Sequence, residues 1–360
     1  MTTLNRFGKQ ILAALAILFW GLTACKNSNS SDHVMTASLM HDIRPRCIGR
    51  FVLDLPRDAE VYNEQFKYMG YSIESTQNVN AQEFAHRVDA RERELRATMR
   101  LDPHKSFTAT KTPWIHQVVR PSDDSRFFVF GRYDVPQGEQ VYDVEGYAVA
   151  DKTLFTLKNR FGDGYDQTAI QNASEILRNI HPRGVWDVPP DSAFCFNGGA
   201  ISGKALPGFD ATLAVGLVPG RPSNLIVKLR ESVDLDQKAS LLKGLSEFES
   251  GLKPYAHQYK ILRKGPRQFA GMPAEELLID ISEDGVQRYQ FYLLAAGVEG
   301  DFSKPHAGIQ LLFGAAPDDV TPAAEATSPV SKEQAIQAWD AVLNSFHYRG
   351  PTANGIGVSK

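Results

Sequence analysis

The feature that most constrains the fold is an internal repeat. Residues 169–183 align without gaps on residues 335–349, and Ala, Ile, Gln, Leu, His and Arg recur at matching positions. From Ile170 to Ile180, apolar residues follow the i, i+3, i+7, i+10 spacing of an amphipathic helix. We therefore expect a duplicated unit, with each half ending on a helix that packs its apolar stripe against a sheet.

The repeated histidines, His181 and His347, lie near the expected ends of these two helices, and Pro182 should stop the first one. A histidine in the last turn is stabilised by the helix dipole. We therefore expect both histidines to be residues of a helix C-terminus and not ligands.

Earlier segments of the two halves also correspond. Each half has a cysteine near its start, then two strand-like segments, an amphipathic helix and three more strands before the final helix. The earlier helices are expected at residues 81–100 and 235–252. Strands are expected at residues 48–55, 68–75, 127–133, 141–150 and 154–160, and at residues 211–218, 224–231, 275–281, 286–295 and 309–313. This ββαβββα order predicts an α+β fold of two similar domains around a cleft, each a mostly antiparallel sheet with helices on one face.

The first 25 residues have the features of an export signal. Arg6 and Lys9 precede an apolar run from Ile11 to Leu22, which is too short to span about 30 Å of hydrocarbon. The sequence Leu-Thr-Ala-Cys25 then resembles the bacterial lipobox, in which small residues admit the chain to a peptidase and the cysteine thiol receives diacylglycerol. We predict lipidation at Cys25; an ordinary secretory signal, in which Cys25 is incidental, is the alternative.

Composition shifts suggest the domain boundaries. We expect a lipoprotein signal peptide at 1–24, a Ser/Asn-rich flexible tether at 25–41, an N-terminal α+β domain at 42–185, a stiff Trp/Pro linker at 186–190, a C-terminal α+β domain at 191–349 and a tail at 350–360. Lys26 stands where an Asp would resemble an inner-membrane retention signal. The expected location is therefore the periplasm, with the lipid anchor in the periplasmic face of the outer membrane.

Two cysteines remain once Cys25 is acylated. Cys47 and Cys195 would both be exported into an oxidising compartment, where they could form a disulfide or stay as two buried thiols. A disulfide would close a loop of about 148 residues and tie the two domains together. In the chain-entropy model it would stabilise the fold by about 4 kcal/mol.

Charge and motifs exclude several classes of protein. The formal net charge of −3 becomes −5 when residues 1–24 are removed, because they carry two cations and no acid, so a nucleic-acid partner is not expected. The sequence lacks the Gly-x-Ser-x-Gly elbow, the His-Glu-x-x-His helix, Cys-x-x-Cys and the phosphate-binding Gly-x-x-x-x-Gly-Lys-Ser/Thr loop. The adjacent acids Glu275 and Glu276 should point to opposite faces of a strand. We therefore predict no catalytic residues, no metal site and no cofactor.

Three segments carry a family resemblance. They are Cys47-Ile-Gly-Arg with Leu55-Pro56, Phe194-Cys-Phe-Asn-Gly-Gly199, and the stretch from Leu262 to Glu276. Together with the lipobox and the length, they resemble the immunity proteins cognate to lipase effectors of the type VI secretion system, specifically the fourth lipase group. The resemblance covers essentially the whole mature chain.

The resemblance implies a function that periodicity does not. Family members lie in the periplasm, bind a phospholipase effector in about a one-to-one complex, grip it between two domains and block the lid motion needed for interfacial activation. The matched motifs belong to core strands and turns, so they assign no residue to the partner interface. Two other classes remain open from the residues themselves: a non-catalytic envelope lipoprotein that acts as a scaffold or binds a ligand or lipid, and an envelope hydrolase.

Overall fold

The computed structural model describes residues 39–101, 111–133, 140–162, 166–189, 192–245, 250, 257–316 and 320–350. The expected signal peptide, Cys25, most of the tether and nearly all of the tail lie outside these residues. No helix within them is long and apolar enough to cross a membrane.

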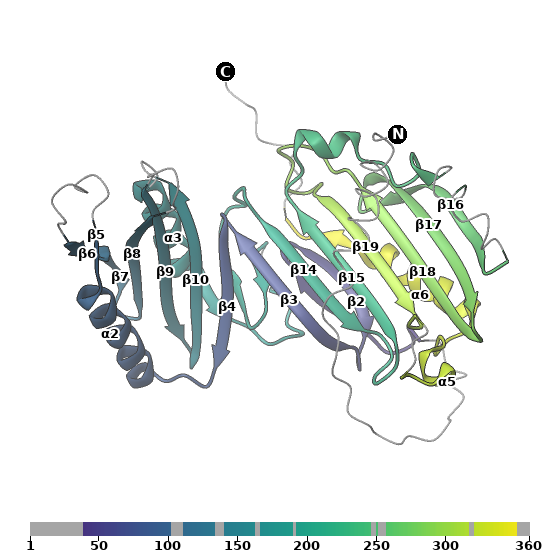
Figure 1. Cartoon of the computed structure of the whole chain (residues 1–360), viewed down its shortest axis with the longest axis horizontal. Coiled ribbons are helices and arrows are strands. Elements are labelled where there is room, and N and C mark those ends of the chain that lie inside the picture. Colours follow the sequence, from purple (N-terminus) through teal and green to yellow (C-terminus); the bar gives the residue numbers. More distant parts are fainter. Residues whose placement is uncertain are drawn as a thin grey trace. The chain divides into compact units, whose positions relative to one another are not determined.

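The largest element is a twelve-stranded antiparallel sheet, whose strands follow one another in Figure 1. Its order is β16-β17-β18-β19-β15-β14-β3-β4-β10-β9-β8-β7, so each half of the chain contributes six strands in mirrored order. The first half supplies β3 (Glu60–Tyr68), β4 (Tyr71–Gln77), β7 (Ile115–Ser122), β8 (Ser125–Tyr133), β9 (Gln140–Ala150) and β10 (Thr153–Gly162). The second half supplies β14 (Asp210–Gly216), β15 (Ser223–Arg230), β16 (Tyr259–Phe269), β17 (Met272–Glu283), β18 (Val286–Ala295) and β19 (His306–Phe313). The halves meet where β3 pairs with β14.

Two of the longer helices begin at local capping signals. The side chain of Asn80 accepts a hydrogen bond from the backbone N–H of Glu83 at the start of α2 (Ala81–Ala97). Ser331 and Gln334 form a capping box at the start of α6 (Lys332–Ser345). The structure also has α3 (Asp166–Asn179), the short α5 (Ala323–Ala326) and the 3₁₀ helix η2 (Asp234–Lys238).

The predicted two-domain α+β architecture with mostly antiparallel sheets is confirmed, and all ten predicted strand segments overlap observed strands. The Glu-Asp-Gly turn between β17 and β18 is present, with positive φ at Asp284 and Gly285. Three strands of the twelve-stranded sheet were not predicted, namely β3, β7 and β16, and the short strands outside that sheet, apart from the segment at residues 48–55, were not predicted either. Strands β3, β7 and β16 lie at the junction of the halves and at the two sheet edges, where polar residues and prolines weaken the apolar alternation.

In the N-terminal domain, helices cover both faces of the sheet and not one. Successive residues of β8 point to opposite faces. Phe127 and Val129 belong to the core that includes α3, whereas Phe128 and Phe130 pack in a second cluster with Val88 of α2. Because this strand is apolar on both sides, each side needs a cover.

The helix predicted at residues 235–252 is wrong at its start. The structure has η2 there, followed by irregular backbone and turns up to residue 244, while residues 246–249 and 251–256 lie outside the described residues. The apolar positions of this segment still pack on the sheet, because Leu241, Leu242 and Leu245 contact residues of β16 to β18.

Both repeat helices end earlier than predicted. They stop at Asn179 and Ser345, so His181 and His347 lie in short strands after the helices. The Nδ1 atom of each histidine lies near the carbonyl oxygen two residues earlier, at 3.3 Å from Asn179 O and 2.8 Å from Ser345 O. The two copies therefore share a local geometry, but it is not a helical last turn.

Two small sheets show that the halves exchange their first hairpins. One sheet pairs β1 (Ile43–Ile48) and β2 (Phe51–Pro56) with β20 (His347–Tyr348), which follows the last helix of the second half. The other pairs β12 (Phe194–Phe196) and β13 (Gly199–Ile201) with β11 (Ile180–Pro182), which follows the last helix of the first half. A separate two-stranded sheet joins β5 (Met99–Leu101) and β6 (Lys111–Pro113). The predicted strand 48–55 therefore corresponds in the repeat to β12 and β13, not to 211–218.

Aromatic rings hold each exchanged hairpin in place. Phe51 of β2 stacks on Phe346 at 5.3 Å between ring centroids, and Phe346 in turn contacts Phe269 at 4.7 Å. In the other half, Phe196 of β12 meets Phe155 of β10 at 5.7 Å. Burying a large aromatic side chain contributes about 1.5–3 kcal/mol, so each hairpin is a substantial part of the domain on which it packs.

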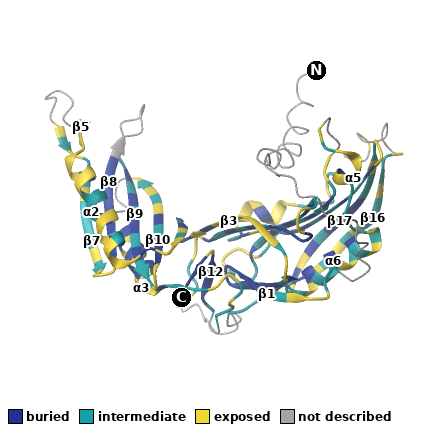
Figure 2. Cartoon of the chain, turned by 90° about the horizontal axis from the view of Figure 1, so that it is seen from below, coloured by how far each residue is buried: buried dark blue, intermediate teal, exposed yellow. Residues whose placement is uncertain are grey.

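Burial follows the strands (Figure 2). Buried residues concentrate in the sheet, and exposed positions recur along α2 and α6. Strands β14, β15 and β19 alternate between buried and half-exposed residues. Their buried side chains join the main core beneath α6, which leaves the opposite face of these strands more accessible.

Candidate functional site

The two halves are joined by a disulfide between Cys47 of β1 and Cys195 of β12, with 5.9 Å between the Cα atoms. Beside it the backbones of Gly49 and Cys195 pair: Gly49 N donates to Cys195 O at 2.9 Å, and Cys195 N donates to Gly49 O at 2.7 Å. Gly49 has a φ of +54° and lies against the ring of Phe194. Since φ is positive and a Cβ would press on that ring, glycine suits this close approach.

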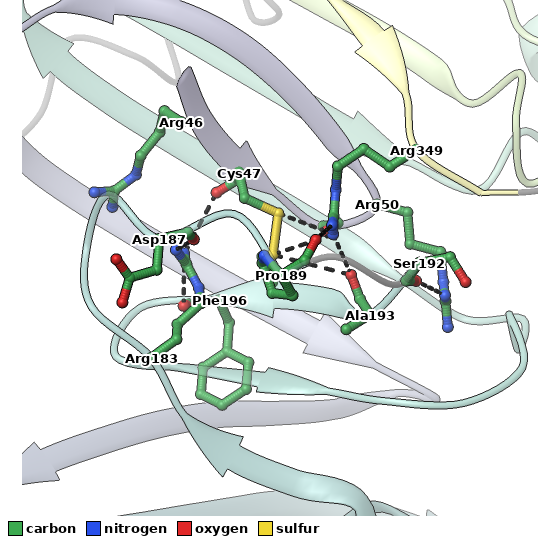
Figure 3. The surroundings of a disulfide bond; sticks show 12 residues. Arg46, Cys47, Arg50, Arg183, Asp187, Pro189, Ser192, Ala193, Phe196 and Arg349 are labelled. Carbon is green, nitrogen blue, oxygen red and sulfur yellow. Dashed lines mark hydrogen bonds between the residues drawn. A yellow bond between two sulfur atoms is a disulfide. The ribbon is translucent and has the colours of Figure 1, made fainter. Parts of the chain in front are cut away.

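Four arginines surround the disulfide, and two of them are equivalent in the repeat (Figure 3). Arg183 follows α3 and donates to the carbonyl oxygens of Phe196 at 3.1 Å, Asp187 at 2.8 Å and Cys47 at 3.5 Å. Burial lowers the pKa of Arg183 to about 10, and the like charge of Arg46 adds to this effect. A guanidinium with this pKa is still protonated near neutral pH.

Arg349 occupies the matching position after α6. Its guanidinium donates to Pro189 O at 2.8 Å and Ala193 O at 2.5 Å, and one of its nitrogens lies 3.3 Å from the sulfur of Cys195. Its backbone N–H donates to Arg50 O at 3.0 Å. The conserved geometry of the repeat therefore brings an arginine to each side of the disulfide.

The other two arginines come from the β1–β2 hairpin. Arg46 forms an ion pair with Glu64 of β3, with side-chain exposures of 1% and 4%, donates to Val185 O at 2.8 Å and lies 5.5 Å from the ring centre of Trp186. Arg50 donates to the carbonyl oxygens of Ser192 and Lys204, the latter at 3.0 Å. The four arginines thus donate charge-assisted hydrogen bonds to carbonyl groups of the described residues between the two domains.

The structure also shows the surroundings of the adjacent acids Glu275 and Glu276. Glu275 and Glu276 do point apart: Glu275 accepts hydrogen bonds from Ser240 and from the N–H of Leu242, whereas Glu276 lies in a buried cluster beneath α6. Within the described residues there is no group of three or more His, Cys, Asp or Glu side chains that could hold a metal ion.

The buried cluster around Glu276 is structural. Trp339 of α6 donates to Glu276 Oε2 at 3.1 Å, and Arg267 also donates to that oxygen at 3.1 Å. Arg263 bridges Glu276 to Asp340 of α6. Burial alone would raise the pKa of Asp340, but its bonds to Arg263 and Arg267 outweigh this and lower the pKa. The paired charges tie α6 to the edge strand β16.

A surface with different chemistry lies on the half-exposed side of the central strands, and we call it the open face. Cross-strand register places Asn63 opposite Ala214, Ala214 opposite Ile226, and Ile226 opposite Gln310. The open face comprises Asn63 and Gln65 of β3, Thr212 and Ala214 of β14, Ile226 of β15, and Gln310 and Leu312 of β19. These seven residues are uncharged, the exposed Lys228 of β15 lies beside them opposite Thr212, and the face crosses the β3–β14 junction between the two domains.

Charged side chains lie at the border of the open face. Arg230 and His306, paired across β15 and β19, meet the buried Asp236 of η2. Burial lowers the pKa of His306, and the nearby Arg230 charge lowers it further. For Asp236, burial raises the pKa, but its bonds to Arg230 and to the Val233 N–H give a net lowering. This cluster fastens η2 to the end of the sheet.

The described part of the chain offers little room for a small ligand. Its best-formed hollow, lined by Arg50, Tyr68, Phe194 and neighbours, has a cavity volume of about 10 Å³. That is room for about one water molecule, whereas ligand pockets are typically about 300–1,000 Å³.

Two family models match the chain in consecutive segments. The model of the Tle cognate immunity protein 4 N-terminal domain matches residues 44–183, and that of the C-terminal domain matches residues 187–351. The chain belongs to this family. In this member of the Tle cognate immunity protein 4 family, the four arginines and the disulfide lie where the two matched segments meet.

Solved structures agree with the assignment at the level of fold. The crystal structure of a Tle4–Tli4 complex is similar with a TM-score of 0.73 and 22% identity, over 87% of this chain and 99% of that chain. The apo immunity protein TplEi of the type VI secretion system from Pseudomonas aeruginosa has a TM-score of 0.71 and 22% identity, over 86% and 98% of the two chains. A comparison with curated proteins found no match.

Proposed function

We propose that this chain is a periplasmic, lipid-anchored immunity protein that binds a type VI secretion phospholipase effector and inhibits it. It holds the effector between its two domains in about a one-to-one complex and blocks opening of the lipase lid. The observation that carries the proposal is the match of both family models, in order, across residues 44–183 and 187–351. The role is binding and not catalysis.

The open face is the surface that we assign to the effector. The centre of a protein–protein interface is typically depleted of charged residues and surrounded by a polar rim. The open face has Ile226 and Leu312 among amide and hydroxyl side chains, and the charged Lys228 and Arg230 follow Ile226 along the same side of β15. Because it crosses the β3–β14 pair, an effector seated there contacts both domains at once.

The partner to test is a type VI secretion phospholipase effector, taken first from the genes that neighbour this one. We expect the wild-type chain to bind that lipase with nanomolar affinity and to inhibit its hydrolysis of phospholipid vesicles. Ile226→Arg should weaken binding by about 100-fold or more, because it places an unpaired charge at the centre of the interface. Isothermal titration and a vesicle hydrolysis assay measure the two effects.

Val320→Arg is the matched control, since this side chain is 90% exposed and belongs to none of the strands that form the open face. It adds the same charge and should leave the affinity within about twofold of wild type. Absence of binding and inhibition by the wild-type chain would refute the proposed function. Equal affinities for the Ile226→Arg and Val320→Arg variants would refute only the assignment of the surface.

The lipid anchor has its own test. Cys25→Ser removes the thiol that would be acylated, so the variant should move from the membrane fraction to the soluble periplasmic fraction. Inhibition of the lipase in solution should be unchanged, because the domains that bind it are intact. Cell fractionation followed by immunoblotting checks this result, and full retention of the variant in the membrane fraction would show that Cys25 is not the anchor.

A further inference from the structure

We propose that the Cys47–Cys195 disulfide is an export-dependent latch on effector binding. The reduced chain does not bind the effector, oxidation after export makes it competent, and the folded protein then resists reduction. This inference rests on the proposed function, whose regulation it describes.

The disulfide lies where it can constrain both domains. It joins the β1–β2 hairpin to the β12–β13 hairpin, and each hairpin packs with the terminal strand of the opposite half of the chain. The adjacent β3–β14 pair carries the open face from one domain to the other. A loosened junction would therefore separate the two parts of the open face, while a closed junction holds them in register.

The surroundings of the disulfide favour the bonded state. Four guanidinium groups gather around it, and the like charges of Arg46 and Arg349 oppose protonation of Arg183. Glu64 and Asp187 lie among these cations, and Arg183 donates to Cys47 O of one hairpin and to Phe196 O of the other, so hydrogen bonds hold the two hairpins at the spacing that the S–S bond closes. Two separate thiols also need more space than a disulfide, in a site where Cys47 and Cys195 are 1% and 0% exposed.

Burial of the two sulfur atoms decides when the disulfide can form and when it can be reduced. Thiol–disulfide exchange requires an attacking thiolate to reach a sulfur atom directly. Here Arg349 lies over the sulfur of Cys195, and Val52 and Val188 pack around the pair. An oxidant must therefore act before the junction closes, and a reductant cannot act until it opens.

The chemistry is a balanced two-electron exchange with a disulfide-bearing oxidant protein of the exporting compartment. One cysteine thiolate attacks the oxidant's disulfide to form a mixed disulfide, and one oxidant sulfur leaves as a thiol. The second cysteine then attacks the mixed bond. The chain loses two electrons and two protons, and the oxidant becomes a dithiol.

The test uses the full exported chain, extracted in mild detergent. One sample stays oxidised, and another is reduced with dithiothreitol in urea and returned to buffer that contains reductant. We expect the reduced chain to bind the effector at least about 100-fold more weakly than the oxidised chain, and oxidised glutathione to restore binding. If the reduced chain binds within about threefold of the oxidised chain, the latch is overturned.

A second measurement tests whether folding protects the disulfide from reduction, and it does not rely on effector binding. Thiol alkylation should detect no reduction when dithiothreitol is added to the folded chain, and complete reduction when urea is present. Arg349→Ala removes one cover of Cys195 and should speed reduction of the folded chain by about tenfold or more. Equal reduction rates with and without urea would contradict the latch. Absence of binding by the oxidised chain would instead refute the proposed function, and the latch with it.

Discussion

Replacing Trp339 by alanine is expected to lower the free energy of unfolding by about 3–5 kcal/mol. The indole is fully buried between α6 and the sheet, and its ring meets Phe291 edge-on at 5.9 Å between centroids. Its Nε1–H also donates to the buried carboxylate of Glu276. Alanine therefore leaves a cavity and removes a donor from a buried charge, and both effects destabilise the fold.

Chemical denaturation under oxidising conditions measures this loss. Trp339→Phe is the matched variant, because it keeps a ring against Phe291 and removes only the donor to Glu276 and part of the volume. This variant should lower the free energy of unfolding by about 1–3 kcal/mol, which is less than the alanine variant does. A loss below about 1 kcal/mol for Trp339→Ala would show that α6 does not anchor the C-terminal domain.

Arg46→Ala should also lower the free energy of unfolding by about 3–5 kcal/mol, in this case for an electrostatic reason. Arg46 and Glu64 form an ion pair in which both side chains are almost completely buried. Removing the cation leaves the Glu64 carboxylate buried without its partner, and it also removes the hydrogen bond to Val185 O and the contact with Trp186. The linker should loosen together with the junction of β3 and β14.

An exposed ion pair provides the control. Arg57 and Asp42 are 3.1 Å apart, but their side chains are 51% and 52% exposed, so Arg57→Ala should cost less than about 1 kcal/mol. Arg46→Met combined with Glu64→Gln removes both charges and should recover much of the loss caused by Arg46→Ala. Equal losses for Arg46→Ala and Arg57→Ala in urea denaturation would contradict a buried, coupled pair.

Local patterns predicted much of the fold because the physics that they reflect is local. Alternation in β15 and β19 and the Glu-Asp-Gly turn between β17 and β18 set the strands and a hairpin regardless of distant contacts. The duplicated helix marked two similar units. The prediction was wrong where local and tertiary preferences compete, as at His181, where pairing of β11 with β13 ends the helix earlier than its apolar periodicity suggested.

The site was less predictable than the fold. Arg46, Arg183 and Arg349 are isolated residues in the sequence, and the only signal for two of them was their repetition after the matching helices. The open face gave no signal either, since Asn63, Ala214 and Gln310 are ordinary residues of separate strands. Their significance comes from register, which places them side by side across the junction.

By itself the sequence determined a duplicated α+β chain of two domains and the family to which its motifs point, and it predicted an export signal with a lipid-modified cysteine. Only the tertiary structure decided that the halves exchange their first hairpins, that Cys47 meets Cys195, and that twelve strands form one sheet. The physical reason is the sequence separation over which each kind of interaction acts. Periodicity, caps and turns act over a few residues, whereas hairpin exchange depends on contacts between residues hundreds of positions apart, such as Phe51 with Phe346.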